Sequence, residues 1–129
     1  MKKLLIAAAF LATALAGYAE ADITFEQIEY DFGTIPEQGG PVTHEFEFVN
    51  TGDLPLMVLN ATASCGCTRP EYPKKPIMPG RSEKIKVTYL PTGRPGEFNK
   101  TITVKTNAKG KNKKSTLRIM GFVTPEAQQ

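Results

Sequence analysis

Long runs of the helix-forming residues alanine, leucine, glutamate and lysine are missing from this chain of 129 residues beyond its first 21 positions. Tryptophan is absent too, whereas proline (10 residues) and glycine (11 residues) are frequent. Since proline and glycine interrupt helices and mark turns, this composition argues against a helical protein. It favours short strands joined by turns.

Motifs of catalysis are also scarce. The sequence has no Gly-rich phosphate loop, no zinc-binding pattern and no paired-carboxylate motif. Its one histidine, His44, alternates with phenylalanines on an expected strand, where a histidine is more often packed or at the surface than catalytic. A Cys67–His44 dyad would lack an oxyanion-stabilising motif beside it. We therefore expect a protein that is not an enzyme and needs no cofactor.

The N-terminus has the three parts of an export signal. These are a positive start (Lys2 and Lys3), an apolar run over residues 4–15 and small residues around a cleavage site (Ala19-Glu20-Ala21). The run is too short to cross about 30 Å of hydrocarbon as a stable helix, and no other stretch of the sequence could span a membrane. We expect a signal peptide over residues 1–21 and a periplasmic or secreted domain over residues 22–129, with a retained N-terminal anchor as the alternative.

Charge is unevenly distributed along the chain. Residues 22–60 contain eight acids and no lysine or arginine, whereas residues 61–129 contain fourteen bases and four acids. One interpretation is a polyanion-binding half. A nucleic-acid binder would interleave aromatic residues with its bases, and the cluster Lys109, Lys111, Lys113 and Lys114 has none. We therefore expect acidic early strands to lie beside basic late strands, and no nucleic-acid partner.

Alternating apolar residues mark about seven short strands, with turn signals roughly every ten residues, which is typical of an immunoglobulin-like β-sandwich. The expected strands cover residues 23–32 (with Gly33 as a break), 42–50, 54–62 (buried on both faces), 82–90, 98–107 and 117–123. The proline-rich stretch 64–80 is expected to be an irregular connection. A small barrel is the alternative. The expected core consists of Phe32, Phe46, Phe48, Leu56, Val58, Ile85, Val87, Ile102, Val104, Leu117 and Ile119.

The one sharp chemical feature is Cys65-Gly66-Cys67. Two thiols one residue apart can form a local disulfide, remain free as a redox pair, or bind a soft metal such as Cu(I). In an exported protein a disulfide is the simplest outcome, although the small ring would add little stability. The metal alternative would use Cys65, Cys67 and His44. We expect the two cysteines to be close enough to bridge and to lie near the surface, where the strand over residues 54–62 ends.

Several short motifs recur in the order found in a known family. They are Asp31-Phe32-Gly33, Phe46-Glu47-Phe48-Val49-Asn50-Thr51-Gly52, Ser64-Cys65-Gly66-Cys67-Thr68, Ile77-Met78-Pro79-Gly80, Ile85-Lys86-Val87-Thr88-Tyr89, Gly96-Glu97-Phe98, Ile102-Thr103-Val104, Asn107 and Gly121-Phe122-Val123. Over nearly all of residues 25–123 the chain resembles the bacterial family called domain of unknown function 1573. That family is similar to immunoglobulin-like domains of the major sperm protein, pilus-chaperone and Hydin types. The resemblance implies a sandwich fold and, by analogy, protein–protein binding.

Two functions follow from these observations. The first is an exported, non-enzymatic immunoglobulin-like module that binds another macromolecule, most simply a protein that adds a strand to an exposed sheet edge. The second is a periplasmic thiol-redox or Cu(I)-binding protein centred on Cys65 and Cys67.

Overall fold

The computed structural model describes residues 19–125, which form two stacked β-sheets whose strand pairs are mostly antiparallel. The elements are β1 (Ile23–Phe25), β2 (Glu29–Pro36), β3 (Val42–Asn50), β4 (Val58–Ala63), β5 (Thr68–Glu71), β6 (Ser82–Tyr89), β7 (Gly96–Thr106), the short 3-10 helix η1 (Gly110–Lys113) and β8 (Lys114–Thr124). The first sheet has the order β1-β3-β6-β5 and the second the order β2-β8-β7-β4. The expected immunoglobulin-like β-sandwich is confirmed, with eight strands where about seven were expected.

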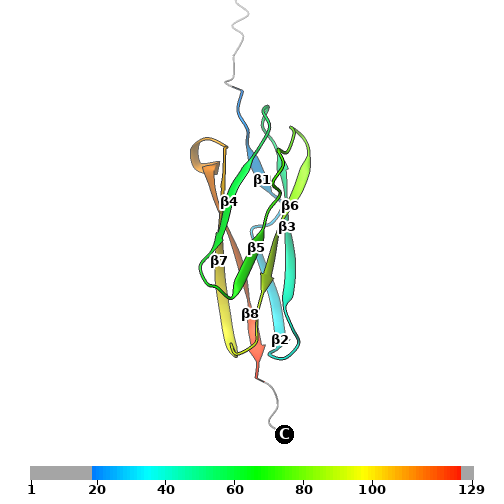
Figure 1. The fold of residues 1–129 in the computed structure, drawn as a ribbon, viewed down its shortest axis with the longest axis vertical. Helices are drawn as coiled ribbons and strands as arrows, with labels where there is room; N and C mark the ends of the chain where they lie inside the picture. The colour runs from blue at the N-terminus through cyan, green and yellow to red at the C-terminus, as the bar shows by residue number, and fades with distance from the viewer. Residues whose placement is uncertain (1–18, 126–129) are drawn as a thin grey trace, which may run out of the picture.

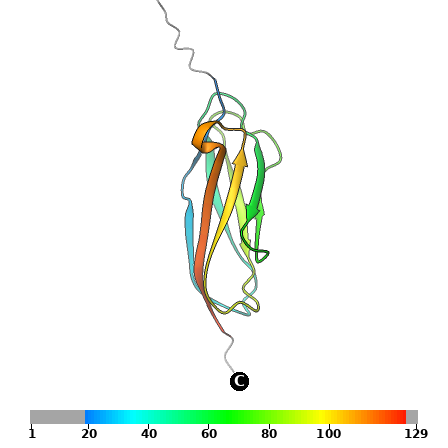
Figure 2. The same cartoon turned by 90° about the vertical axis from the view of Figure 1, so that its left-hand side faces the viewer.

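The sandwich is elongated, and the two ends of the described chain lie at its opposite ends (Figure 1). After β1 pairs with β3, the chain changes sheets, and β2 runs parallel to β8. In Figure 2, β2 (light blue) follows one edge of the second sheet beside β8 (orange to red). The other named strand pairs are antiparallel. Both β2 and β4 therefore have one side without a partner strand among the described residues.

The core fills the space between the sheets, as the alternating sequence pattern predicts. Ten of the eleven expected core residues are buried, namely Phe46, Phe48, Leu56, Val58, Ile85, Val87, Ile102, Val104, Leu117 and Ile119. Phe32 is the exception, because it lies on an edge strand and is only partly buried against the core. The ring of Tyr89 stacks on that of Phe98 with their centroids 3.9 Å apart, which links the two sheets.

Two expectations about the strands are wrong in detail. Gly33 does not end a strand: it takes a φ of 71° within β2, where the register against β8 shifts between Asp31 and Thr34. It is therefore a bulge, which a glycine accommodates easily because it has no Cβ. The stretch 54–62 is not buried on both faces either. Pairing with β7 begins at Val58, with an irregular register between Val58 and Asn60, and Leu59 is 56% exposed because the outer face of an edge strand meets solvent.

The stretch 64–80 also contains a strand that the sequence did not indicate. β5 pairs with β6 in spite of Pro70, which faces Val87 across the pair. The expected turn at Met78-Pro79-Gly80 is present, since the Arg81 amide donates to the Met78 carbonyl at 3.0 Å and Gly80 has a φ of 80°. The connection is therefore partly regular rather than irregular throughout.

Acidic and basic strands lie side by side, as expected from the charge distribution. Glu45 and Glu47 of β3 face Lys86 and Lys84 of β6 in the sheet register, and the Lys84 Nζ lies 3.5 Å from a carboxylate oxygen of Glu45. The acids of β3 thus lie opposite lysines of β6 within one sheet. Such exposed pairs each contribute at most about 1 kcal/mol to stability.

Residues 1–18 lie outside the described residues, so the export signal stays a prediction. Within residues 19–125 the structure contains no helix long and apolar enough to cross a membrane. Two residues that precede the expected cleavage site contact the domain. Ala21 is buried, and the Glu20 carbonyl accepts a hydrogen bond from the Asp53 amide at 2.8 Å.

Candidate functional site

The Cys65-Gly66-Cys67 element lies where the chain passes from β4 in the second sheet to β5 in the first. The two cysteines form a disulfide across Gly66, with their Cα atoms 5.2 Å apart. One backbone hydrogen bond closes the turn, and another ties it to the chain at the end of β6. The Thr68 amide donates to the Cys65 carbonyl at 3.2 Å, and the Leu90 amide donates to the Cys67 carbonyl at 2.9 Å.

The two sulfurs have different environments. Cys65 is half-buried, whereas Cys67 is fully buried among core residues. The expectation that both lie near the surface is therefore wrong for Cys67. The reason is that β5 begins directly after it and directs its side chain between the sheets. Only Cys65 is accessible to a thiol or a metal ion from outside.

His44 packs in an aromatic cluster rather than beside the cysteines. Its ring stacks on Tyr30 of β2 with centroids 3.7 Å apart and meets Phe46 edge-on at 4.7 Å. Burial lowers the pKa of His44, and the nearby Glu45 carboxylate opposes that shift. β6 lies between β3, which carries His44, and β5, which follows the disulfide. Neighbouring strands lie about 4.8 Å apart, so two strand spacings separate the histidine from the disulfide.

The structure therefore does not bring His44, Cys65 and Cys67 together, so neither the alternative three-residue metal site nor a Cys67–His44 dyad is assembled. In the described part of the chain, no group of three or more histidine, cysteine, aspartate or glutamate side chains is arranged to hold a metal ion. The disulfide is the only part of the predicted chemical site that the structure builds.

The sheet edges offer a different kind of site. Each sheet has two: β1 and β5 bound the first sheet, and β2 and β4 bound the second. β1 has only three residues. β5 has four residues, one of which is Pro70. Since the Cys67 carbonyl faces β6, the alternation of an antiparallel ladder turns the backbone of Pro70 away from β6, toward the open side. Proline has no N–H there, so β5 presents a blunted edge.

The edge of β4 is partly covered by the chain that follows β5. The Tyr72 hydroxyl donates to the Leu59 carbonyl at 3.4 Å, at the point where the register of β4 against β7 is irregular. The Lys74 ammonium lies 3.4 Å from the centre of the Tyr72 ring. These contacts place side chains over the backbone groups that a partner strand would need.

β2 is the longest edge strand of the sandwich, with eight residues. The Arg118 amide of β8 donates to the Ile28 carbonyl at 2.8 Å. Because backbone groups alternate along a strand, the N–H and C=O groups of Glu29 and Asp31 face away from β8. This open ladder ends at the bulge, where the Gly33 amide donates to Asp31 Oδ1 at 2.7 Å. Residues 29–32 therefore present an unpaired strand edge.

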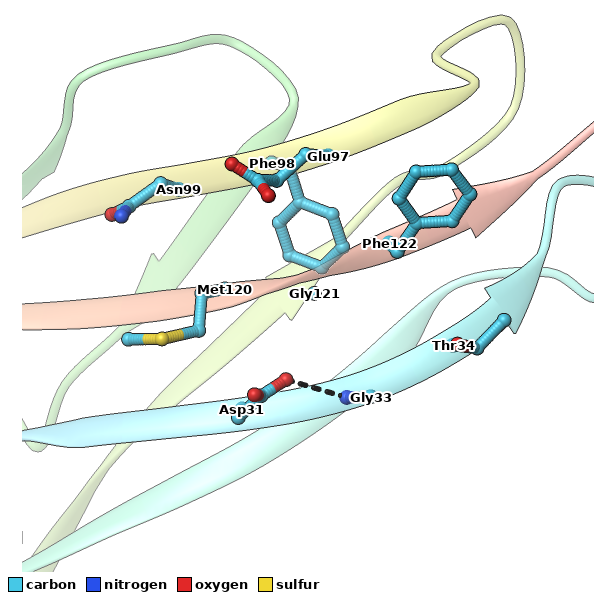
Figure 3. Close-up of a pocket in the computed structure, with 9 residues that line it drawn as sticks. All are labelled: Asp31, Gly33, Thr34, Glu97, Phe98, Asn99, Met120, Gly121 and Phe122. Carbon is cyan, nitrogen blue, oxygen red and sulfur yellow. Dashed lines mark hydrogen bonds between the residues drawn. The ribbon is translucent and has the colours of Figure 1, made fainter.

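A shallow hollow of about 390 Å³ lies beside this edge, on the outer face of the second sheet (Figure 3). The side chains of Asp31, Glu97, Met120 and Phe122 border it, and no lysine or arginine is among its lining residues. Phe122 is 46% exposed. The hollow thus combines two carboxylates with exposed apolar surface, next to an open strand edge.

Sequence reasoning located the two cysteines and the histidine but missed the β2 edge and the hollow. A signal was present, because residues 28–32 alternate apolar and acidic side chains. That alternation cannot tell an edge strand from a central one, and the parallel pairing of β2 with β8 joins residues about 90 positions apart.

Comparison with solved structures shows the same fold at low sequence identity. The chain is similar to a protein of unknown function from Porphyromonas gingivalis W83, with a TM-score of 0.70 and 15% identity over 87% of this chain and 51% of that one. It is also similar to the ASH/PapD-like domain 7 of human CEP192 (TM-score 0.55, 17% identity, 85% and 89% covered). The YadV chaperone gives a TM-score of 0.52 at 18% identity, with 84% and 54% covered.

The chain therefore spans about half the length of the Porphyromonas gingivalis protein and of YadV. No curated protein matches it. The family model described as "Protein of unknown function (DUF1573)" matches residues 23–123, which is almost the whole described domain. The chain belongs to this family.

Proposed function

We propose that the mature chain is an exported, non-enzymatic immunoglobulin-like module that binds another protein in the periplasm or outside the cell. Export is supported by the positive start, apolar run and Ala19-Glu20-Ala21 cleavage pattern of the sequence. The observation that carries the binding proposal is the open edge of β2, whose backbone donors and acceptors at Glu29 and Asp31 face away from the sheet.

An open strand edge favours a protein partner over other ligands. An extended peptide satisfies a row of alternating N–H and C=O groups with its own backbone, and pockets beside the edge then select its side chains. The hollow bordered by Asp31 and Phe122 supplies such a pocket. The likeness to PapD-like domains and to a chaperone supports the same function by fold analogy alone.

The test is chemical crosslinking of the tagged mature protein in the cell envelope of its source, followed by identification of the captured proteins. A Cys65→Ser/Cys67→Ala double variant serves as the matched control, because alanine at the buried position avoids a new buried hydroxyl. The proposal expects one discrete partner, captured equally by both proteins. Capture of no discrete partner by the wild type would refute it.

The second candidate is a thiol-redox or Cu(I)-binding function, and one observation favours it. The disulfide joins residues only two positions apart, and Cys65 is accessible while Cys67 is not. A small thiol can therefore attack one defined sulfur. Equilibration with glutathione buffers, and Cu(I) titration of the reduced protein, test this function. Reversible cycling within the range of periplasmic potentials, or tight copper binding that needs both cysteines, would favour it over the first candidate.

A further inference from the structure

We infer that the open edge of β2 takes up an extended segment of the partner in which basic and apolar residues alternate. The inference rests on the proposed function and adds the place of binding and the chemistry of the bound segment. It follows from two features of β2, its free backbone groups and the two rows of side chains beside them, from the pairing of β3 with β6, and from the local charge.

The backbone groups define the direction of approach. Glu29 and Asp31 are exposed, and their N–H and C=O groups point away from β8. A strand laid along this edge exchanges hydrogen bonds with both residues and extends the second sheet by one strand. The bulge at Gly33 ends the ladder, because its amide already donates to Asp31 Oδ1. The bound segment therefore pairs along residues 28–32.

The side chains beside this edge form two rows. Glu29 and Asp31 lie on the outer face of the second sheet, and Asp31 borders the hollow. Tyr30 and Phe32 lie on the inner face, toward His44 and Phe98 respectively. Ile28 is 52% exposed and Tyr30 is 36% exposed, so this row presents apolar surface next to the free edge. A partner strand therefore meets carboxylates on one face and apolar surface on the other.

The pairing of β3 with β6 shows which sequence satisfies such rows. β3 also carries acids on its outer face and aromatic residues on its inner face, and it resembles β2 in this respect. Its partner β6 places Lys84 and Lys86 opposite the acids, and Ile85 and Val87 in the core. Opposite charges and apolar neighbours across a strand pair are the contacts that stabilise sheets. A segment with the pattern of β6 is therefore the complement of β2.

The local charge favours the same partner. Within residues 19–125, Asp31 forms no ion pair, and Glu29 has only a long one, to Arg118 at 3.9 Å with both side chains exposed. A lysine opposite Asp31 would lie one strand spacing away, about 4.8 Å. From there its side chain reaches the Asp31 carboxylate at the near rim of the hollow, and Glu97 on β7 adds a more distant negative charge across the hollow.

The probe is a synthetic peptide with the sequence of residues 82–89, acetylated and amidated, titrated into the ¹⁵N-labelled mature protein and followed by NMR. We expect the amide signals of Glu29 and Asp31 to shift most. A control peptide with both lysines replaced by glutamate should bind at least about tenfold more weakly. A second control, N-methylated at alternate residues so that its edge toward β2 has no donors, should fail to bind. Raising the salt from about 0.05 to 0.5 M should weaken binding several-fold.

Two variants of the protein separate backbone from charge. In Glu29→Pro the lost N–H is one that faces away from β8, so the fold keeps its hydrogen bonds while the edge loses a donor. In Glu29→Ala the donor remains and only the carboxylate is lost. We expect about tenfold weaker peptide binding for the proline variant and about threefold for the alanine variant. If the proline variant does not fold, the N-methylated peptide decides the same question on the wild-type protein.

The inference is wrong if the peptide shifts signals elsewhere, if the glutamate peptide binds as well as the lysine peptide, or if the labelled protein pairs with a second copy through β2 in place of the peptide. Failure of the β2 site would not by itself refute the proposed function. A partner captured from the envelope equally by wild type and by Glu29→Pro would show that a protein is bound at another surface. Absence of any captured partner would instead remove the proposed function itself.

Discussion

Asn50 provides a sharp test of how the fold is held together at the end of β3. Its side chain is fully buried and makes three short hydrogen bonds to backbone groups, besides a long one of 3.5 Å that Oδ1 accepts from the Asp22 amide. Nδ2 donates to the Leu54 carbonyl at 2.8 Å and to the Ile77 carbonyl at 2.9 Å, and Oδ1 accepts from the Gly52 amide at 2.9 Å. One amide side chain thus joins the turn after β3 to the segment that leads into β6.

The cost of Asn50→Ala follows from the fate of these partners. The Ile77 carbonyl keeps a second hydrogen bond, from the Leu56 amide at 2.8 Å. The Leu54 carbonyl and the Gly52 amide lose their hydrogen bonds to Asn50, but both groups lie near solvent. At about 1 kcal/mol for each lost bond, with a small cavity in addition, the variant should lose about 3 kcal/mol of unfolding free energy. For a domain of this size the melting temperature should fall by about 10–15 °C.

The matched variant Asn50→Asp tests the polarity of the site. The introduced carboxylate would face two carbonyl oxygens in a buried position, so its pKa in the folded state should rise above the unfolded value of about 3.9. A raised pKa means that the variant is most stable, relative to wild type, below about pH 4 and loses that stability as pH rises through the folded pKa. Urea unfolding of all three proteins at pH 4 and pH 7 measures both effects. An alanine variant within 1 kcal/mol of wild type, or a deficit of the aspartate variant that does not change with pH, would refute the reasoning.

Three further predictions concern the core, the disulfide and the N-terminus. Phe46→Ala should lower the unfolding free energy by about 3–5 kcal/mol in urea titrations, because the ring is fully buried; a wild-type melting curve would contradict the observed packing. Reduction of Cys65–Cys67 should cost less than about 2 kcal/mol, since the closed ring is so short, and a larger loss on adding reductant would give the pair a structural role. Mass spectrometry of the exported protein should find Asp22 at or within a few residues of the N-terminus; a chain that keeps Met1 would contradict cleavage.

The sequence predicts those strands whose apolar alternation is clean. β3 has the expected bounds, and β6 differs by one residue from its expected end, because their inner residues are apolar and their outer residues charged. β5 was missed because Pro70 and the Cys-Gly-Cys turn are ordinary signals of irregular chain. Proline is tolerated there only because β5 is an edge strand whose outward N–H is not needed. That fact depends on the position of β5 in the sheet and not on its own residues.

The candidate site was less accessible to sequence reasoning than the fold. The proximity of Cys65 and Cys67 follows from their spacing, but the burial of Cys67 depends on the direction in which β5 begins. His44 could be named only as an alternative third ligand, because the sequence does not show the sheet order, which places β6 between His44 and the start of β5. The openness of β2 is a property of which strands lack neighbours, and it appears only once both sheets are assembled.

The edges of this sandwich are protected in different ways, and the difference bears on which partner β2 accepts. β1 is short, β5 is blunted by Pro70, and β4 is partly covered by Tyr72. β2 has only its bulge and its acids. Two copies of the domain meeting edge to edge at β2 would place Glu29 and Asp31 of one copy opposite those of the other, and like charges across a strand pair are destabilising. The acids therefore oppose self-association at the edge where they attract a basic strand. The same two residues would protect the free domain from aggregation and select its partner, because both effects depend on the sign of the charge that approaches.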